Sequence, residues 1–156
     1  MGRMAGDHAL DALHIETRVD APTNVLVIDD DEGVRDVLAA WVEADGCQPV
    51  AAESAAAALS AAAERPVAVA LCDVQMPGRD GFWFVEQVQA SHPDIAVVLV
   101  TGVHDVDWAL RGLQHGVVDY LLKPFDQRSL SRALENGMRQ QRLRRADRLL
   151  REQRAS

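Results

Sequence analysis

Residues 25–31 read VLVIDDD, a run of aliphatic residues that ends in three consecutive aspartates. A continuous apolar run of this kind predicts a strand that is buried on both faces, as in the parallel sheets of α/β proteins. Similar short apolar runs occupy residues 67–72, 95–100 and 117–122, and a weaker one occupies residues 48–52. The chain is therefore expected to contain five strands.

Helical patterns fill the segments between these strands. After the first strand, apolar residues follow the spacing i, i+3, i+4, i+7, i+8 of an amphipathic helix, at Val34, Val37, Leu38, Trp41 and Val42. Further helices are expected from a cap at Ser54 to about Glu64, from Asp80 through Val88, around residues 106–113, and from about Asp126 onward. Strands that alternate with helices predict an α/β fold with a parallel sheet covered on both faces.

The carboxyl ends of the expected strands carry the residues best suited to chemistry. Asp29 and Asp30 follow the first strand, Asp73 the third, Thr101 the fourth and Lys123 the fifth. In open parallel sheets ligands bind beyond these ends, where the strand order reverses. Converging carboxylates repel one another unless a cation binds, and Mg²⁺ prefers such oxygen ligands. The pattern predicts a magnesium site at which Asp73 attacks phosphorus while Thr101 and Lys123 contact phosphoryl oxygens.

Lysine usage adds to this prediction. The chain has 16 basic residues, and Lys123 is the only lysine among them. Lysine presents a compact ammonium group, whereas arginine presents a planar fork. A chain that uses arginine everywhere else and keeps one lysine favours a position that needs the smaller charged group over the alternative, which is chance placement.

Four segments in unbroken order resemble the receiver domains of two-component response regulators. They read VLVIDDD at 25–31, LCDVQMPGRDG at 71–81, VTG at 100–102 and DYLLKPF at 119–125. The resemblance covers about residues 24 to 138. It implies a flavodoxin-like, doubly wound, five-stranded parallel sheet with strand order 2-1-3-4-5 and an extended C-terminal helix. It also implies a signalling domain rather than a classical enzyme.

The resemblance assigns roles to the acidic residues. Asp73 would accept a phosphoryl group from a sensor histidine kinase or a histidine phosphotransfer protein, and the domain itself would catalyse both its phosphorylation and its dephosphorylation. Asp30 and Asp73 would bind Mg²⁺ directly, Asp29 directly or through water, and Gln75 through its backbone carbonyl.

The resemblance also implies a switch. Thr101 would move toward the phosphoryl group and the Tyr120 ring would turn inward behind it, while Lys123 would pair with a phosphoryl oxygen. The bond from Lys123 to Pro124 would be cis. The fourth helix, fifth strand and fifth helix would pass the change to an output domain or partner. Val103 offers no group to position an attacking water, so we expect slow loss of the phosphoryl group.

The charge distribution divides the chain. The net charge is −8, and the segment from Gly137 onward carries seven arginines against Asp147 and Glu152, a net of +5 that leaves −13 for the rest. We therefore expect an N-terminal extension at 1–23, a receiver domain at 24–138 and a basic helical linker or tail at 139–156. The acidic body argues against nucleic acid as a partner of this chain. A homodimer would form through the signalling face or the C-terminal helix.

The remaining composition favours a cytoplasmic location without membrane contact. No apolar run approaches the ~20 residues that span a bilayer, and the first 20 residues lack the pattern of a signal peptide. The two cysteines, Cys47 and Cys72, lack the spacing of metal ligands.

Two other functions are weighed against this sequence. A phosphatase of the haloacid-dehalogenase type also uses a strand-end aspartate, in an Asp-x-Asp signature. Asp29 and Asp31 have that spacing, but Gly33 stands where the signature needs threonine or valine. The third reading is an interaction module that is not phosphorylated.

Overall fold

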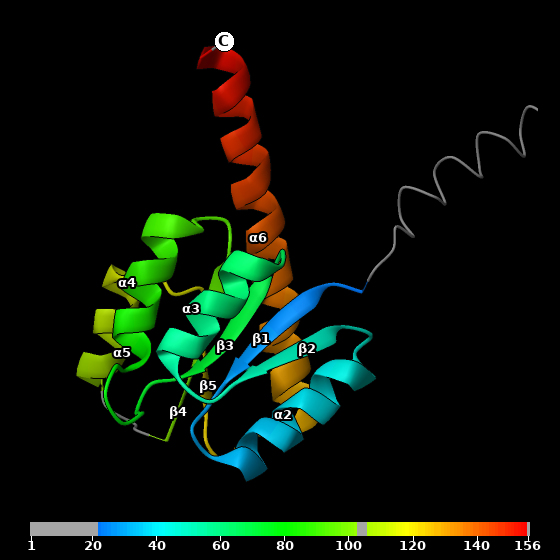
Figure 1. The fold of residues 1–156 in the computed structure, drawn as a ribbon, viewed down its shortest axis with the longest axis vertical. Helices are drawn as coiled ribbons and strands as arrows, with labels where there is room; N and C mark the ends of the chain where they lie inside the picture. Colours follow the sequence, from blue (N-terminus) through cyan, green and yellow to red (C-terminus); the bar gives the residue numbers. More distant parts are fainter. Residues whose placement is uncertain (1–21, 103–105, 156) are drawn as a thin grey trace, which may run out of the picture.

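The computed structural model describes residues 22–102 and 106–155, which form a five-stranded parallel sheet with helices on both faces (Figure 1). The strand order is β2-β1-β3-β4-β5, so the expected 2-1-3-4-5 topology is confirmed. The strands are β1 (Asn24–Ile28), β2 (Gln48–Ala52), β3 (Val69–Asp73), β4 (Ala96–Thr101) and β5 (Asp119–Leu122). The helices are α2 (Glu32–Ala44), α3 (Ala55–Glu64), α4 (Gly81–Ser91), α5 (Val106–Gln114) and α6 (Gln127–Ala155).

Alternate residues of β1 supply two separate apolar cores. Leu26 and Ile28 pack with α3 and α4, whereas Val25 and Val27 pack with α2 and α6. This division follows from the two-residue period of a strand, which points successive side chains to opposite faces. Every residue of β3 and β4 is buried, and the exposed positions lie on the edge strands β2 and β5. The apolar runs were therefore clearest for the strands that are covered on both faces.

Aspartate and serine side chains cap the amino ends of four helices. Asp31, Ser54, Asp80 and Asp126 each accept a hydrogen bond from a backbone amide two or three residues further along, at 2.8–3.1 Å. Such caps satisfy amides that have no partner inside the helix. The helix beginning at Gly81 continues three residues beyond the expected Val88, to Ser91, and the backbone amide of His92 still donates to the carbonyl of Val88.

The fifth strand is shorter than its apolar run. Residues 117 and 118 were expected to belong to it, but β5 begins at Asp119, paired with Val98. Gly116 has a φ of +81°, and the chain then passes through Val117 before the ladder starts. Val117 is buried in the apolar core nevertheless. The apolar run therefore marked core residues that precede the strand as well as the strand itself.

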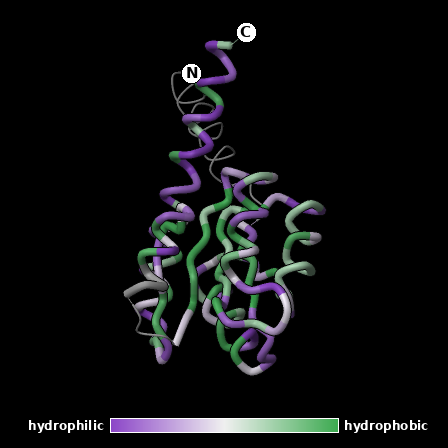
Figure 2. The backbone as a smooth tube through the Cα atoms, turned by 90° about the vertical axis from the view of Figure 1, so that its left-hand side faces the viewer, coloured by the Kyte–Doolittle hydropathy of each residue, from purple (hydrophilic) through white to green (hydrophobic). Residues whose placement is uncertain are grey.

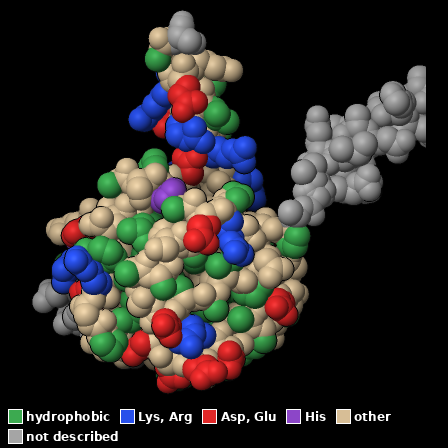
Figure 3. Space-filling view, viewed as in Figure 1, with side chains coloured by type: hydrophobic (Ala, Val, Ile, Leu, Met, Phe, Trp, Pro, Cys, Tyr) green, Lys and Arg blue, Asp and Glu red, His purple; other side chains and the backbone are tan. Residues whose placement is uncertain are grey.

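The last helix projects beyond the sheet as a single element of 29 residues, which confirms the extended C-terminal helix (Figures 1 and 2). Its first half packs on the sheet through Leu130, Ala133 and Leu134. Its second half is hydrophilic and carries most of the arginines of this helix, while acidic side chains gather at the opposite end of the molecule (Figure 3). In the described part of the chain, no helix combines the length and apolar character that a membrane crossing requires.

Two arginines fasten this helix to the body. The Arg144 guanidinium donates to the backbone carbonyls of Ile95 at 3.2 Å and Gly116 at 3.0 Å, which lie just before β4 and β5. Arg148 donates to Asp94 Oδ2 at 2.8 Å. The segment that was expected to be a linker or tail is thus held against the amino ends of two strands.

Candidate functional site

The carboxyl ends of four strands meet at one edge of the sheet and bring together the side chains expected there. Asp29 follows β1, and Asp73 is the last residue of β3. Thr101 is the last residue of β4, and its carbonyl accepts a hydrogen bond from the backbone amide of Lys123 at 2.8 Å, just after β5. The parallel registers place these ends level with one another, so residues up to 94 positions apart share one site.

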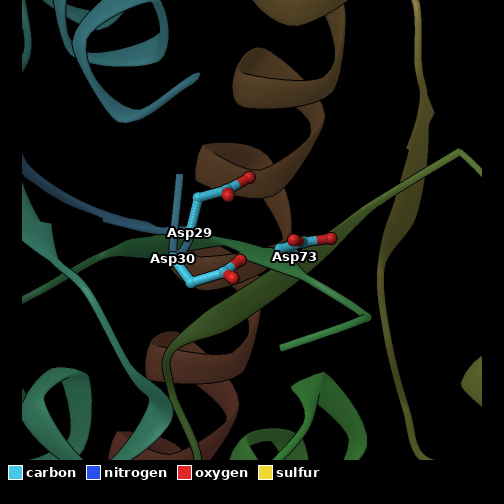
Figure 4. Close-up of side chains that lie close together, drawn as sticks. All are labelled: Asp29, Asp30 and Asp73. Carbon is cyan, nitrogen blue, oxygen red and sulfur yellow. The ribbon is translucent and has the colours of Figure 1, made fainter. Parts of the chain in front are cut away.

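Three carboxylates form a cluster at the centre of this edge (Figure 4). One oxygen from each of Asp29, Asp30 and Asp73 lies within 4.8 Å of the others. Asp29 and Asp73 are 1% and 6% exposed, whereas Asp30 is open to solvent. A hard divalent cation that keeps part of its water shell suits such a set, because the buried oxygens provide ligands and the exposed side admits water.

Lys123 supplies the positive charge. Its ammonium nitrogen lies 3.3 Å from Asp29 Oδ2 and 3.7 Å from Asp73 Oδ1. One cation among three carboxylates leaves the cluster with excess negative charge. The donor set therefore fits a magnesium ion both in its chemistry and in its charge.

The environment raises the pKa of Asp73 to about 6, from an ordinary value of 3.8. Burial is the largest cause, and the nearby Asp29 carboxylate adds to it. The Lys123 ammonium and the backbone amide of Gln75, which donates to Asp73 Oδ1 at 3.3 Å, act in the opposite direction. A bound cation would favour the charged form, so proton and metal compete for this carboxylate.

The first aspartate is held rigidly by the turn that follows it. Asp29 Oδ1 accepts the backbone amide of Asp31 at 2.9 Å, and its carbonyl oxygen accepts Arg35 Nη1 at 2.8 Å. Sequence reasoning did not identify Arg35, and no local signal distinguishes it from other helical arginines. Asp31 accepts the amides of Gly33 and Val34, so its carboxylate serves as the cap of α2. This capping role leaves the phosphatase hypothesis without its second aspartate.

The expected switch residues lie on the two strands that follow β3 in the sheet, Thr101 at the end of β4 and Tyr120 in β5. Thr101 is 2% exposed, and Tyr120 is partly buried against the core that includes Phe82 and Val117. The Lys123–Pro124 peptide bond is cis, as the resemblance implied. Val103, which was expected to influence loss of the phosphoryl group, lies outside the described residues.

Comparison with known proteins agrees with this geometry. The sequence model of the response regulator receiver domain matches residues 25–135. The chain is 36% identical to the response regulator protein FleR of Pseudomonas aeruginosa. The alignment spans 106 residues and covers 68% of this chain and 22% of FleR. It is 38% identical over 102 residues to the DNA-binding transcriptional regulator NtrC of Escherichia coli K12, covering 65% of this chain and 22% of NtrC. The chain thus spans about a fifth of the length of these curated relatives.

Solved structures show the same architecture. A response regulator receiver domain protein from Clostridium thermocellum superposes with a TM-score of 0.73 at 28% identity, over 78% of this chain and 98% of that one. NtrX from Brucella abortus in complex with ADP gives a TM-score of 0.77 at 26% identity, over 83% of this chain and 30% of NtrX. Since the family match spans most of the described fold and includes all four strand ends of the site, the chain belongs to the response regulator receiver domain family.

Proposed function

We propose that Asp73 accepts a phosphoryl group in a reaction that requires Mg²⁺, and that the modified domain signals to an output domain or partner. The observation that carries this proposal is the position of the Asp73 carboxylate, nearly buried between two further aspartates and an ammonium group. A structural aspartate would not need a second and third carboxylate within 4.8 Å, because like charges at that distance are costly.

Each residue of the site has a distinct part in the proposed reaction. One Asp73 oxygen attacks phosphorus, a new O–P bond forms, and the bond from phosphorus to the donor breaks with the electron pair leaving on the donor. Lys123 neutralises one phosphoryl oxygen, and the Thr101 hydroxyl donates a hydrogen bond to another. Asp29, Asp30 and the Gln75 carbonyl would hold Mg²⁺, which supplies charge neutralisation and orientation of the phosphoryl oxygens.

The proposed donor is a phosphohistidine of a sensor kinase or of a phosphotransfer protein. The receiver is therefore the acceptor in a transfer between proteins, and its own residues supply the catalysis. At neutral pH Asp73, with a pKa of about 6, is mostly ionised and hence nucleophilic.

The signal would leave through the face formed by α5, β5 and α6. Thr101 and Tyr120 would couple the phosphoryl group to this face, where Leu110, Leu113 and Leu122 are 44–66% exposed. Coupling energies of about 1–3 kcal/mol are usual for such two-state systems. A homodimer would use this face or the projecting half of α6, where Leu143 and Leu150 are exposed with seven-residue spacing.

Labelling by a small phosphodonor tests the proposal. Acetyl phosphate and Mg²⁺ are expected to add one phosphoryl group to the full chain, and the Asp73→Asn variant is expected to remain unlabelled. Chelation of Mg²⁺ is expected to stop labelling of the wild type. Labelling of Asp73→Asn at the wild-type rate, or labelling that survives chelation, would reject the assignment.

A further inference from the structure

Gly112, in the last turns of α5, lies directly against the Tyr120 ring. A Cβ atom built at Gly112 would overlap the Tyr120 hydroxyl oxygen and would lie 2.5 Å from Cζ and 3.1 Å from Cε2. Ordinary contacts between carbon atoms are about 3.5–4.0 Å. The ring therefore occupies space that exists only because residue 112 has no side chain.

The backbone gives no other reason for glycine at this position. Among the described residues, the glycines with positive φ are Gly46, Gly78 and Gly116, and Gly112 is not one of them. It lies inside α5, where glycine is about 1 kcal/mol less favourable than alanine. A residue that weakens its own helix and adopts an ordinary conformation points to a packing requirement, and the Tyr120 ring is the group that it meets.

The contact also satisfies the hydroxyl end of the ring. Burial raises the pKa of Tyr120, and a hydrogen bond involving the Gly112 backbone lowers it in part. The rest of the ring packs on the core that includes Phe82 and Val117. Gly112 is itself buried, so the ring and the helix backbone close off this part of the molecule together.

Tyr120 also lies next to the strand that carries the other expected switch residue. Tyr120 pairs with Leu99 on β4. Thr101 lies two residues further along β4 and pairs with Leu122. Tyr120 therefore lies in the strand next to the one that ends at Thr101, and its ring contacts α5 at Gly112. The ring can move deeper toward α5 only as far as the helix backbone at residue 112 leaves space for it.

We propose that Gly112 is a positioning residue of the switch, whose missing side chain forms the slot that admits the Tyr120 ring. The identity of residue 112 then sets the balance between the inward ring and more exposed positions. This inference rests on the proposed function for its signalling consequence, while the slot itself depends only on the contact between these two residues.

The test uses Gly112→Ala in the full chain, with Leu113→Ala as the matched control. Leu113 is the next residue of the same helix, and it is 66% exposed. Because the chain contains one tyrosine, ¹³C-labelled tyrosine gives one set of ring signals that report on Tyr120 alone. In Gly112→Ala the ring signals should move toward the shifts of exposed tyrosine, and the change on adding acetyl phosphate and Mg²⁺ should fall about fivefold or more. In Leu113→Ala the ring signals should match the wild type.

A double-variant comparison separates the slot from a general effect on folding. Tyr120→Leu removes the hydroxyl and Cζ, so adding Gly112→Ala to it should cost no stability, whereas Gly112→Ala alone should lower the urea midpoint. Equal losses in both backgrounds, or unchanged ring signals in Gly112→Ala, would overturn the proposal. Failure of the proposed function would look different, since the ring would still respond to Gly112→Ala while acetyl phosphate left wild-type Asp73 unlabelled.

Discussion

The Lys123 ammonium nitrogen lies 3.7 Å from Oδ1 of Asp73, although β4 separates β3, which ends at Asp73, from β5, which ends one residue before Lys123. The pairing of Thr101 with Leu122 brings the end of β5 level with the end of β4, and the pairing of Asp73 with Val100 does the same for β3. The lysine side chain then reaches across the strand between them. The distance leaves the ammonium close enough to contact a group attached to Asp73.

Replacing this lysine tests the need for a compact charge. Lys123→Ala is expected to slow labelling by acetyl phosphate about tenfold or more, because a charge-assisted contact to the phosphoryl group is lost. Lys123→Arg keeps the charge but changes its shape, so it should restore only part of the rate. Initial labelling rates measured with saturating Mg²⁺ provide the comparison. Full activity of Lys123→Ala would show that the ammonium group has no part in the reaction.

The raised pKa of Asp73 predicts a stability change with pH. The folded carboxyl binds its proton more tightly than the unfolded one, so its contribution to stability is complete below about pH 3.8 and is lost as pH rises through about 6. In a Mg²⁺-free buffer at about pH 7.5, Asp73→Asn should therefore be more stable than the wild type, by up to about 3 kcal/mol. Urea unfolding in the presence of a chelator measures this difference.

The same comparison in acid supplies the control. Near pH 4 the folded wild type carries a protonated Asp73, and the two proteins should have similar unfolding free energies. Saturating Mg²⁺ at neutral pH should stabilise the wild type more than Asp73→Asn. An advantage of the variant that is the same at both pH values would mean that charge burial is not its cause.

Replacing Asp31 distinguishes the receiver assignment from the phosphatase hypothesis. Asp31→Ala removes the cap of α2 and should lower the free energy of unfolding by about 1 kcal/mol, while labelling of Asp73 continues. Ser54→Ala removes a cap at a helix away from the site and is the matched control. If Asp31→Ala abolished labelling while Ser54→Ala did not, a chemical role for the Asp29-x-Asp31 pair would have to be considered again.

The arginine contacts predict that the projecting helix moves with the sheet. Arg144→Ala removes two hydrogen bonds to backbone carbonyls, each worth about 0.5–1.5 kcal/mol. Amide hydrogen exchange in residues 140–155 should become faster in this variant. Arg151→Ala is the control, because Arg151 pairs only with Asp147 on the same helix in the described contacts and its side chain is 76% exposed. Equal exchange in both variants would show that the contacts to the sheet do not hold the helix.

Local sequence patterns identified the fold because its central strands are buried on both faces. Continuous apolar runs and capping residues mark such strands and the helices between them, and parallel strands bring their carboxyl ends to one edge. This rule is why Asp29, Asp73 and Lys123 could be expected to meet. The same patterns began β5 two residues early, because Val117 is buried in the core without belonging to the strand. They ended α4 at Val88, the last buried position of that helix, although the helix continues to Ser91.

Contacts between distant segments could not be read from local patterns. The hydrogen bonds of Arg144 to Ile95 and Gly116 depend on the angle at which α6 leaves the sheet. The contact of Gly112 with Tyr120 depends on how closely α5 approaches β5. An arginine in a basic helix, or a glycine in a short helix, does not by itself indicate which distant residue it will contact.

Mapping the phosphorylated residue tests the central claim most directly. The wild-type chain would be treated with acetyl phosphate and Mg²⁺, the acyl phosphate reduced with borohydride, and the modified residue located by tandem mass spectrometry. We expect the modification at Asp73 and at no other aspartate. Modification at Asp29, or an unmodified chain under conditions in which Mg²⁺ binding is demonstrated, would contradict the assignment of Asp73 as the phosphoacceptor.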